Sequence, residues 1–396
     1  MDPAVRTIQL EGDPYQIGLS HGRLLSAEVQ HLRRQVDQFV FRRLGRVRGT
    51  AVRAISAGLC RAMERYIPES YRQEMRGIAR GSGVGYGDVL LLNCLDDVLN
   101  VFRRVAPPIR SQACSSFVLL GSRTADGRLI HGRNLDYHFR NTPLDDGGGV
   151  ARLLHKWTVL FSIRPTGRAA FLSVGWPGMA GAQTSINEHG LALGNLTSYA
   201  GQVTPLAVPT GFIYRQMAEG ASTLRETSAI LRAARRTMGN NLMVSSGRES
   251  SAALFEFLPD AVAEISPRNG FLASTNHFNS PALAHRQRPY LLPHSVDRWR
   301  RLNELLARGA VTVEEGCGFL ADTTCATTED GKKTLGVIAN EGTAVSVLFR
   351  PELMELWMGV SRKPPASHGE WIRLDAASLL AGRGEGPGKP QSHEGR

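Results

Sequence analysis

The chain has 396 residues, of which 42% are hydrophobic and 21% are charged, so it is long enough for one large globular domain or two ordinary ones. No stretch approaches 18 consecutive apolar residues, and the opening sequence MDPAVRTIQLEGDPYQIG has no apolar core of a secretory signal, so we expect neither a membrane-spanning helix nor a leader. The net charge of +11 comes mostly from arginine without any nucleic-acid-binding motif, which predicts a solvated basic surface and no nucleic-acid partner.

The cysteines are few, odd in number and scattered, and none forms a C-x-x-C pair. This usage fits a reducing compartment, so we expect a cytoplasmic protein without a disulfide framework. Neither H-E-x-x-H nor a comparable ligand spacing occurs, so we expect no metal and no other cofactor. The cysteines are Cys60, Cys94, Cys114, Cys317 and Cys325.

Helical patterns occupy about the first 110 residues. Apolar residues recur at helical spacing from Ile17 to Val40, over about seven turns. AVRAISAGLCRAMERYI and YRQEMRGIARGSG predict two further amphipathic helices, and the glycines that close the second fit a C-cap. YGDVLLLNCLDDVLNVF predicts another helix with Asp88 as its N-cap, and Pro107 and Pro108 then break the periodicity.

Strands dominate the rest of the chain. SSFVLLGS and RLIHGRNLDY flank RTADGR, whose Asp-Gly pair predicts a hairpin. Short apolar runs follow, with helices predicted at about 209–236, 295–308 and 311–321 and strands near 241–275 and up to about 358. Because strands and helices are grouped, the pattern favours an α+β layered architecture over a doubly wound parallel sheet. We expect the tail at 382–396 to be disordered.

Cys114 opens the first of these strands, within SQACSSFVLL. A lone cysteine in an apolar run is usually a buried small hydrophobe. Here the cysteine begins a strand, its neighbours are small, and the paired strand carries Arg133, Asn134 and Asp136. Since side chains alternate along a strand, Arg133 and Asp136 need a bend or bulge to converge on one site.

A cysteine with a free α-amine would carry its own base. The amine has an ordinary pKa of about 7.7 to 8.0 and the thiol one of about 8.5, so the two can exchange a proton near neutral pH without a histidine. An internal Cys114 gains this amine only if the 113–114 bond is cleaved, and its own thiol can attack that bond. Cleavage would leave residues 1–113 as a helical α chain and residues 114–396 as a β chain, of which residues 114–381 form the catalytic part.

The segment ACSSFVLLGSRTADGRLIHGRNLDYHF resembles the start of the mature β chain in cysteine N-terminal-nucleophile (Ntn) hydrolases. It is most similar to the penicillin (isopenicillin N) acyltransferase or C45 peptidase-like group, and more distantly similar to acid ceramidase and choloylglycine hydrolase. The resemblance implies a four-layer αββα fold of two antiparallel sheets, with the nucleophile at a strand edge. Other blocks similar to the group are IQLEGDPYQIGLSHG, MRGIARGSGVGYGDVLLLN, TSINEHGLALGNLT, ASTNHF and SVDRWRRLNELL.

The resemblance also implies roles for matching residues. Cys114 would be the nucleophile and, through its amine, the base. Asp136 would hold the amine and thiol in register, and Arg133 would bind substrate or stabilise charge beside the thiolate. Asn195 and Asn276 would be oxyanion-hole donors, and the loss of one such donor typically costs about 10²–10³ in kcat.

Two further residues are predicted to contact the substrate or the site. Arg298 would be an active-site arginine, with Arg301 as its competitor, and Tyr137 would contact substrate. Ordinary structural roles compete with these assignments. Asp136 could be a turn residue, the two asparagines could satisfy backbone groups at strand ends, and Arg298 could lie on a helix surface.

The chain departs from the group's pattern around the nucleophile. Ala113 and Ser115 stand where the group tends to have Gly and Thr, and Leu135 stands where it tends to have Trp. We therefore do not assume penicillin as substrate. We expect an amidohydrolase that cleaves a small non-peptide amide through an S-acyl-Cys114 thioester, with an N-acyltransferase that uses acyl-CoA or another thioester as the alternative.

Two other functions compete less well. A papain-like Cys-His-Asn enzyme would use His277, but no C-G-S-C-W-type signature is present. An uncleaved pseudoenzyme or basic binding protein would not need Cys114. For the leading function we expect the α and β chains to stay associated, and the sequence leaves a homo-oligomer open.

Overall fold

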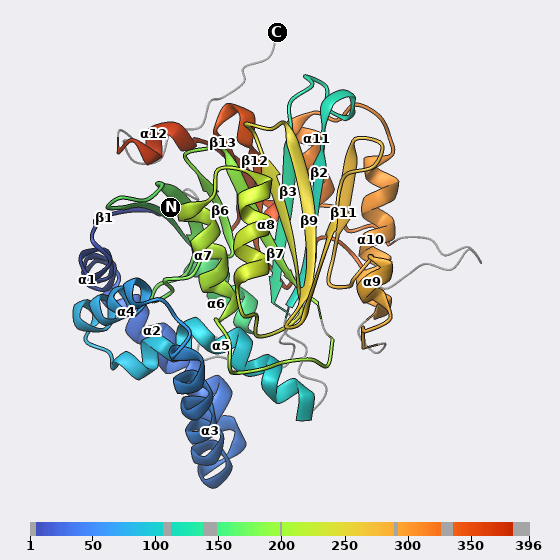
Figure 1. The fold of residues 1–396 in the computed structure, drawn as a ribbon. Coiled ribbons are helices and arrows are strands. Elements are labelled where there is room, and N and C mark those ends of the chain that lie inside the picture. Colours follow the sequence, from blue (N-terminus) through green and yellow to red (C-terminus); the bar gives the residue numbers. More distant parts are fainter. Residues whose placement is uncertain are drawn as a thin grey trace.

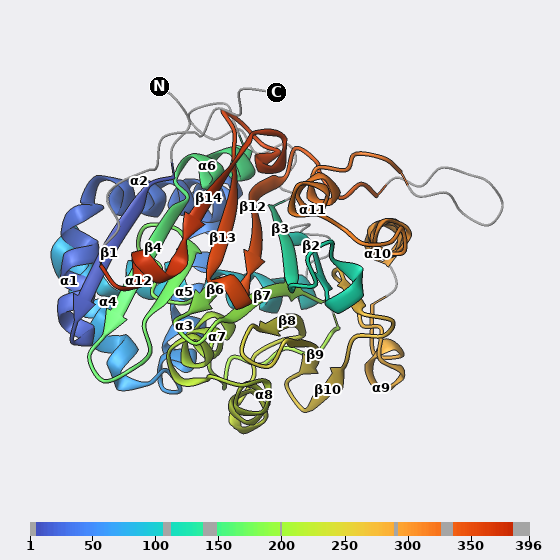
Figure 2. The ribbon, with the colours of Figure 1, turned by 90° about the horizontal axis from the view of Figure 1, so that it is seen from above.

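The computed structural model describes residues 5–105, 112–137, 149–198, 200–288, 292–325 and 336–382. Two β-sheets lie face to face, and helices cover the outer face of each sheet (Figures 1 and 2). All strand pairs in these sheets are antiparallel except one. This helix–sheet–sheet–helix stack confirms the predicted α+β, four-layer αββα architecture.

The first sheet has eight strands in the order β1-β4-β5-β6-β7-β8-β9-β10. The parallel pair joins β1 to β4, so residues 7–12 add a strand to this sheet. The description of residues 1–113 as a helical segment is therefore wrong at these positions. The bounds are β1 Thr7–Gly12, β4 Val159–Pro165, β5 Phe171–Gly175, β6 Thr184–Asn187, β7 Leu191–Thr197, β8 Asn240–Ser246, β9 Ser251–Leu258 and β10 Ala261–Ile265.

The second sheet has six strands in the order β11-β2-β3-β12-β13-β14. Strands β2 and β3 form the predicted hairpin, in which Cys114 lies opposite Leu135. The predicted Asp-Gly turn is present, and Gly127 there has a φ of 75° that favours glycine. The sheet extends past the last predicted strand to β14. The bounds are β11 Phe271–Ser274, β2 Gln112–Leu119, β3 Ile130–Tyr137, β12 Thr343–Arg350, β13 Glu355–Val360 and β14 Glu370–Asp375.

Three hydrophobic layers hold the stack together. The inner layer lies between the sheets, and Cys114 belongs to it. The outer face of the first sheet packs on α7 (Thr210–Gly220) and α8 (Leu224–Ala233). The outer face of the second sheet packs on α10 (Leu292–Leu306) and α11 (Val313–Leu320). The shorter helices are α6 Gly149–Lys156, α9 Pro281–Ala284 and α12 Ala376–Leu380.

The amino-terminal helices differ from the predicted ones at two points. The periodic stretch that begins at Ile17 is interrupted at Leu25, whose φ of −122° and ψ of 28° separate two helices. Asp88 does not cap a helix but lies in the first turn of α5, where its carboxylate pairs with Arg33 and Arg53 at 3.2 and 3.3 Å. The bounds are α1 Pro14–Leu24, α2 Ser26–Val36, α3 Arg46–Glu64, α4 Glu69–Ser82 and α5 Tyr86–Val105.

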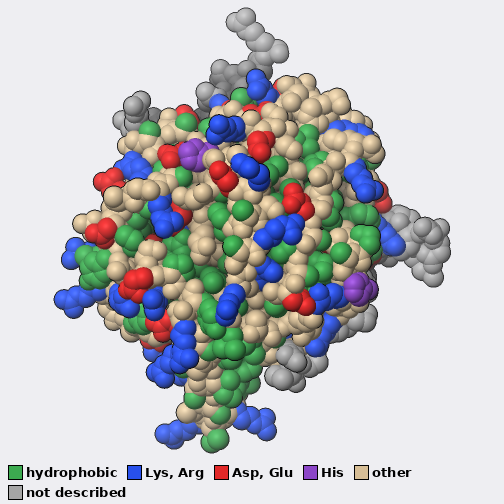
Figure 3. Space-filling view, in the orientation of Figure 1, with side chains coloured by type: hydrophobic (Ala, Val, Ile, Leu, Met, Phe, Trp, Pro, Cys, Tyr) green, Lys and Arg blue, Asp and Glu red, His purple; other side chains and the backbone are tan. Residues whose placement is uncertain are grey.

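Some expectations fall largely outside the described residues. Pro107 and Pro108 lie between two described ranges, and of the tail at 382–396 only Gly382 is described. The five cysteines are all unpaired. No helix among the described residues is long and apolar enough to cross a bilayer. On the face shown in Figure 3, basic side chains are scattered and interspersed with acidic ones.

Helices α1 and α4 pack with their backbones in close contact. The repeats GLSHG and GIARG place Gly18 and Gly22 against Gly77 and Gly81. A Cβ added at Gly18 would overlap the carbonyl oxygen of Glu74. The absence of side chains at these positions is therefore what allows the two helices to approach.

A buried ion network joins α4 to α7. Arg215 on α7 donates to Glu74 on α4 at 3.1 Å and to Glu219 at 3.0 Å. The Tyr71 hydroxyl donates to Glu219 at 2.6 Å. Removing one partner from a buried ion pair leaves an uncompensated charge, so this network ties the amino-terminal helices firmly to the first sheet's outer layer.

Substituting Gly18 tests the close helix contact. We expect Gly18→Ala to lower the free energy of unfolding by about 1–3 kcal/mol, because the added methyl group forces α1 away from α4. The matched control is Gly58→Ala on the exposed face of α3, where no atom lies within 4 Å of the added Cβ. This change should raise stability by about 0.5–1 kcal/mol. Urea unfolding measures both, and an equal stabilisation by the two substitutions would contradict the packing.

Candidate active site

Cys114 is the third residue of β2, and its side chain is completely buried. Its backbone N–H donates to Oδ1 of Asn276 at 2.6 Å, and its carbonyl oxygen accepts a hydrogen bond from Arg298. Both main-chain polar groups of this cysteine are therefore held by side chains. A cysteine that only fills a core has no need of such an arrangement.

Asn276 follows β11 and connects the two sheets. Its Oδ1 accepts from the Cys114 nitrogen and from Nη2 of Arg298 at 2.9 Å, and its Nδ2 donates to the carbonyl of Thr197 on β7 at 2.8 Å. Because two donors contact one end of the side-chain amide and a carbonyl contacts the other, the oxygen and nitrogen of this amide are assigned without ambiguity. The side chain thus presents its oxygen to the Cys114 nitrogen and its Nδ2 to Thr197, and its role as an oxyanion-hole donor stays a prediction.

Arg298 enters the site from α10. Besides Cys114 and Asn276, it donates to the hydroxyl of Ser115 at 2.9 Å, and it is buried. Its competitor Arg301 faces elsewhere, toward Asp322 at 2.6 Å. The structure therefore places Arg298, and not Arg301, beside Cys114.

Arg133 reaches the site from the inner face of β3. Its Nη2 donates to the backbone oxygen and to Oδ1 of Asn195 at 2.7 and 2.8 Å. A Cβ at Gly194 would lie 2.7 Å from the Arg133 Cδ, so only a glycine lets this side chain cross to the other sheet. Gly194 was missed by the sequence analysis, although a glycine inside the predicted strand LALGNLT was the available signal.

Among the described residues, the side chain of Asn195 has a hydrogen-bond partner only at Oδ1. A guanidinium can only donate, so the contact with Arg133 fixes Oδ1 of Asn195 toward the arginine. Its Nδ2 is then directed away from Arg133. This orientation leaves an N–H group for another acceptor, as the predicted oxyanion role requires.

Asp136 lies on the other face of β3 from Arg133. The hairpin register is continuous from residue 130 to 137, so β3 lacks the bulge that would bring the two side chains to one face. The irregularity lies instead in the partner strand β12, between Thr343 and Val345. The two side chains therefore act on Cys114 from opposite sides of the strand, which is feasible because Cys114 lies near the strand's beginning.

The carboxyl group of Asp136 is buried and only partly compensated. Asn340 Nδ2 donates to its Oδ2 at 3.1 Å, a contact that the sequence analysis did not anticipate. Burial raises the pKa of Asp136 to about 7, and the charge of Arg298 with hydrogen bonds from Thr343 and Asn340 opposes this rise. The group is therefore placed to change its protonation state near neutral pH.

Burial is also the main influence on the pKa of the Cys114 thiol, and it raises this pKa above the ordinary value. The charge of Arg133, the backbone N–H of Asp136 and the charge of Arg298 favour the thiolate, and the Asp136 carboxylate opposes it. The guanidinium groups of Arg133 and Arg298 therefore lie where they would stabilise a thiolate after a base has removed the proton.

His277 and Tyr137 lie near the site without touching the thiol in any described contact. His277 Nδ1 hydrogen-bonds to the Ser295 hydroxyl at 2.8 Å, and burial lowers the pKa of this histidine to about 4. It is therefore placed to support the fold and not to act as a papain-like base. Tyr137 packs edge-on against Trp176, with ring centroids 5.6 Å apart, in the same inner layer as Cys114.

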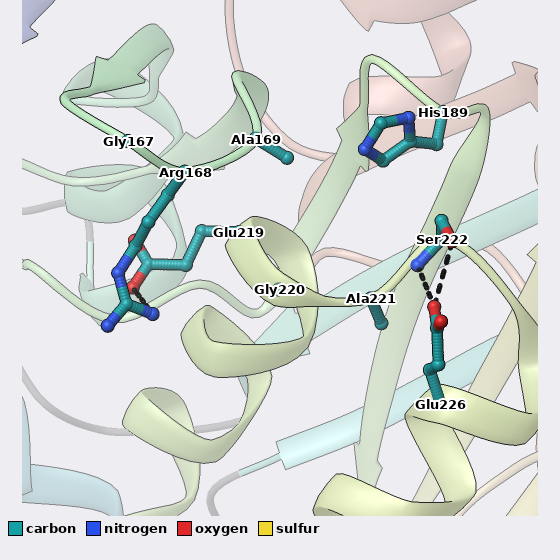
Figure 4. Close-up of a pocket in the computed structure, with 9 residues that line it drawn as sticks. All are labelled: Gly167, Arg168, Ala169, His189, Glu219, Gly220, Ala221, Ser222 and Glu226. Carbon is teal, nitrogen blue, oxygen red and sulfur yellow. Dashed lines mark hydrogen bonds and ion pairs between the residues drawn. The ribbon is translucent and has the colours of Figure 1, made fainter.

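An open hollow of about 610 Å³ lies at the opposite end of the first sheet (Figure 4). His189, in the turn before β7, lines this hollow, whereas the Cys114 site adjoins the far end of β7. Figure 4 shows that its charged groups have partners, since Arg168 pairs with Glu219 at 3.2 Å and Ser222 donates to Glu226. No predicted catalytic residue lines it, so it is separate from the candidate active site.

The αββα layers and a cysteine at a strand beginning, flanked by two arginines and an aspartate, define an enzyme of the Ntn-hydrolase class. Residues 122–363, more than half of the chain, match the family model described as acyl-coenzyme A:6-aminopenicillanic acid acyl-transferase. The chain belongs to this family. The match includes every candidate site residue from Arg133 to Arg298 but begins on the carboxyl side of Cys114.

Several curated proteins are similar to the chain. An uncharacterized protein of Archaeoglobus fulgidus is 26% identical over 348 residues, which are 78% of this chain and 56% of that protein. Protein dcd1A of Dictyostelium discoideum is 25% identical over 247 residues, 57% of this chain and 52% of that protein. The N-acylethanolamine-hydrolyzing acid amidase of Caenorhabditis elegans is 37% identical over 75 residues, 19% of each. The chain spans about half the length of the first two relatives.

Two solved structures resemble the fold. The Caenorhabditis elegans N-acylethanolamine-hydrolyzing acid amidase ortholog is 17% identical, with a TM-score of 0.44 over 61% of this chain and 94% of its own. A mutant of the conjugated bile acid hydrolase from Clostridium perfringens is 13% identical, with a TM-score of 0.40 over 67% and 94%. Both scores are low, and the family assignment does not depend on them.

The thiolate-stabilising role of Arg133 can be tested by alkylation. Its positive charge lowers the pKa of Cys114, so Arg133→Gln should raise that pKa and reduce the thiolate fraction at any given pH. The pH profile for alkylation of Cys114 by iodoacetamide, followed by mass spectrometry, should therefore shift to higher pH, and Arg133→Lys should shift less.

Cys317 serves as an internal control for this experiment. It is buried, and burial raises its pKa to about 12, so it should stay unreactive in wild type and variant alike as long as the fold is intact. An unchanged profile for Cys114, or a shift to lower pH, would contradict the assignment.

Proposed function

We propose that the chain is a precursor that cleaves its own 113–114 peptide bond and then hydrolyses a small non-peptide amide through an S-acyl-Cys114 thioester. The observation that carries this proposal is the hydrogen bond from the Cys114 nitrogen to Asn276. Side chains of the site thus hold the backbone nitrogen of this cysteine in place, in addition to surrounding its thiol. That is the requirement of an enzyme whose base is the α-amine of its nucleophile.

Self-cleavage needs no other reactant than water. The Cys114 sulfur attacks the carbonyl carbon of Ala113, the C–N bond breaks, and the nitrogen takes up the proton that the thiol gives up. The resulting thioester between residues 113 and 114 is hydrolysed by water, which leaves a carboxylate on Ala113 and restores the thiol. Cys114 then carries a free α-amine.

The catalytic cycle repeats the same chemistry on a substrate. The α-amine takes the thiol proton, the thiolate attacks the substrate carbonyl, and Nδ2 of Asn195 donates to the oxyanion that forms. The α-ammonium protonates the leaving nitrogen, so an amine departs and a thioester remains. The amine next removes a proton from water, and the attacking hydroxide releases the acid and restores the thiol.

The remaining residues hold these atoms in position. Asn276, fixed by Arg298 and Thr197, would keep the Cys114 nitrogen within reach of its own sulfur. Asp136, with a pKa near neutral, would stabilise the α-ammonium when it is ionised. Arg133 would stabilise the thiolate, and Tyr137 would contribute to the apolar wall beside it.

An acyl transfer to an amine is the second candidate function. It is favoured by the family description, which names an acyl-transferase that uses an acyl-coenzyme A donor. The same S-acyl-Cys114 thioester would serve both reactions, and the outcome would depend on whether water or an amine reaches it. The sequence similarity to an N-acylethanolamine-hydrolyzing acid amidase favours hydrolysis for this chain.

We further propose that residues 1–113 and 114–396 remain one particle after cleavage, as α and β chains. Strand β1 pairs with β4, and the Arg215–Glu74 contact crosses the proposed chain division, so separation would expose a sheet edge and a buried charge. Five unpaired cysteines support a reducing compartment, which for this chain we take to be the cytoplasm.

Intact mass measures the processing step. Purified wild-type protein should give two fragments that meet at 113/114, whereas Cys114→Ala should give one uncut chain, because it lacks the sulfur that attacks the bond. Cys317→Ala, which removes another buried thiol, should be cleaved like wild type. A wild-type chain that remains whole while it turns over an amide would refute the free-amine mechanism.

A further inference from the structure

A small polar cavity lies directly beside the proposed site, at the carboxyl end of β7. Thr197, whose carbonyl accepts from Asn276, is followed by Ser198, and Ser198 lines this cavity. The hydroxyl of Ser198 is buried and has no hydrogen-bond partner among the described residues. Buried hydroxyls are almost always satisfied, so an orphan one that faces a cavity points to a ligand.

The cavity is small and built from four segments. It measures about 20 Å³, which is enough for a water molecule or for the oxygens at the end of a small anion. The end of α5 contributes Asn100 and Arg103, and the segment after β7 contributes Ser198 and Gly201. The residues before β8 and Arg288 complete the lining. These segments are distant in sequence, so the cavity depends on the assembled fold.

Two guanidinium groups line this cavity without any acidic side chain among its described lining residues. Arg103 is buried, and its Nη1 reaches Oδ1 of Asn100 at 3.3 Å. Arg288 forms no ion pair or hydrogen bond with any residue in the described ranges. An anion in this space would stabilise the guanidinium group of Arg288 and accept a hydrogen bond from the Ser198 hydroxyl.

The backbone around Arg288 is shaped for its guanidinium group. A Cβ added at Gly201 would lie 2.6 Å from both Nε and Nη2 of Arg288, so the group rests closely on the glycine. The neighbouring Arg286 differs, since its charge is matched by Asp260 at 2.8 Å. Arg288 is thus held in place by packing and not by a protein anion.

We propose that this cavity is an anion subsite of the active site, and that the substrate of Cys114 carries a carboxylate or a similar oxyanion near its scissile amide. The subsite rests on the proposed function for its role in catalysis. Its position supports that role, because the hydrogen bonds from Cys114 to Asn276 and from Asn276 to Thr197 lead to the residue next to Ser198. Charge-assisted hydrogen bonds from Arg103 and Arg288 and one from Ser198 would hold the anion.

Matched substrates test the proposal and locate the anion. N-decanoylglycine and N-decanoylglycinamide differ in the charge of the amine half, close to the amide. Succinic acid monoanilide and its primary amide differ in the charge of the acyl half, again close to the amide. We expect wild type to prefer the charged member of one of these pairs. Arg288→Gln should lower kcat/KM for that substrate about 10- to 100-fold and leave its neutral partner within about twofold.

Two variants control for other effects of the substitution. Gly201→Ala keeps the charge of Arg288 but displaces its guanidinium, so it should act in the same direction as Arg288→Gln. Arg286→Gln removes a nearby charge that already has a partner, and it should change neither substrate of the pair. An equal loss for charged and neutral substrates in Arg288→Gln would overturn the subsite.

Binding without turnover separates this proposal from the proposed function. Calorimetric titration of Cys114→Ala, which can neither cleave itself nor form a thioester, should show tighter binding of the charged compound in one of the two pairs. Arg288→Gln in that background should abolish the difference. Equal binding of both compounds in both pairs would refute the subsite, whatever the activity of the wild-type enzyme.

Discussion

The candidate active site depends on one hydrogen bond, from the Cys114 nitrogen to Oδ1 of Asn276. The acceptor is itself fixed, because Arg298 donates to the same oxygen and Nδ2 of Asn276 donates to Thr197. Thr197 belongs to the first sheet and Cys114 to the second, so the stacking of the two sheets sets the position of the nitrogen. The layered fold and the chemistry are therefore linked through one amide side chain.

The placement of charged side chains around Cys114 follows from the same stacking. Arg133 crosses between the sheets over Gly194, while Asp136 and Arg298 approach Cys114 from the helix-covered side of the second sheet. Burial raises the pKa of the thiol and of the Asp136 carboxyl together. A buried site of this kind is poorly reactive until a base appears next to the sulfur, which is what a newly released α-amine would be.

Much of this arrangement could be predicted from the sequence, because hydrophobic periodicity and turn residues report the local structure. The hairpin around Asp126–Gly127 and the grouping of helices and strands followed from them. Three features could not be predicted, because each depends on which distant segments meet. They are the contact of Asn340 with Asp136, the space that Gly194 leaves for Arg133, and the position of Arg298 rather than Arg301 beside Cys114. The strand at residues 7–12 was missed because it is completed by β4, about 150 residues later.

The central claim is that acyl groups pass through the sulfur of Cys114 in a chain that begins at this residue. The most direct measurement is mass spectrometry of the purified enzyme, quenched in acid during turnover of an N-acyl amide. The account predicts that the fragment beginning at Cys114 gains the mass of the acyl group minus one hydrogen, as a hydroxylamine-sensitive thioester. Turnover with the acyl group on another residue, or on an uncleaved chain, would contradict it.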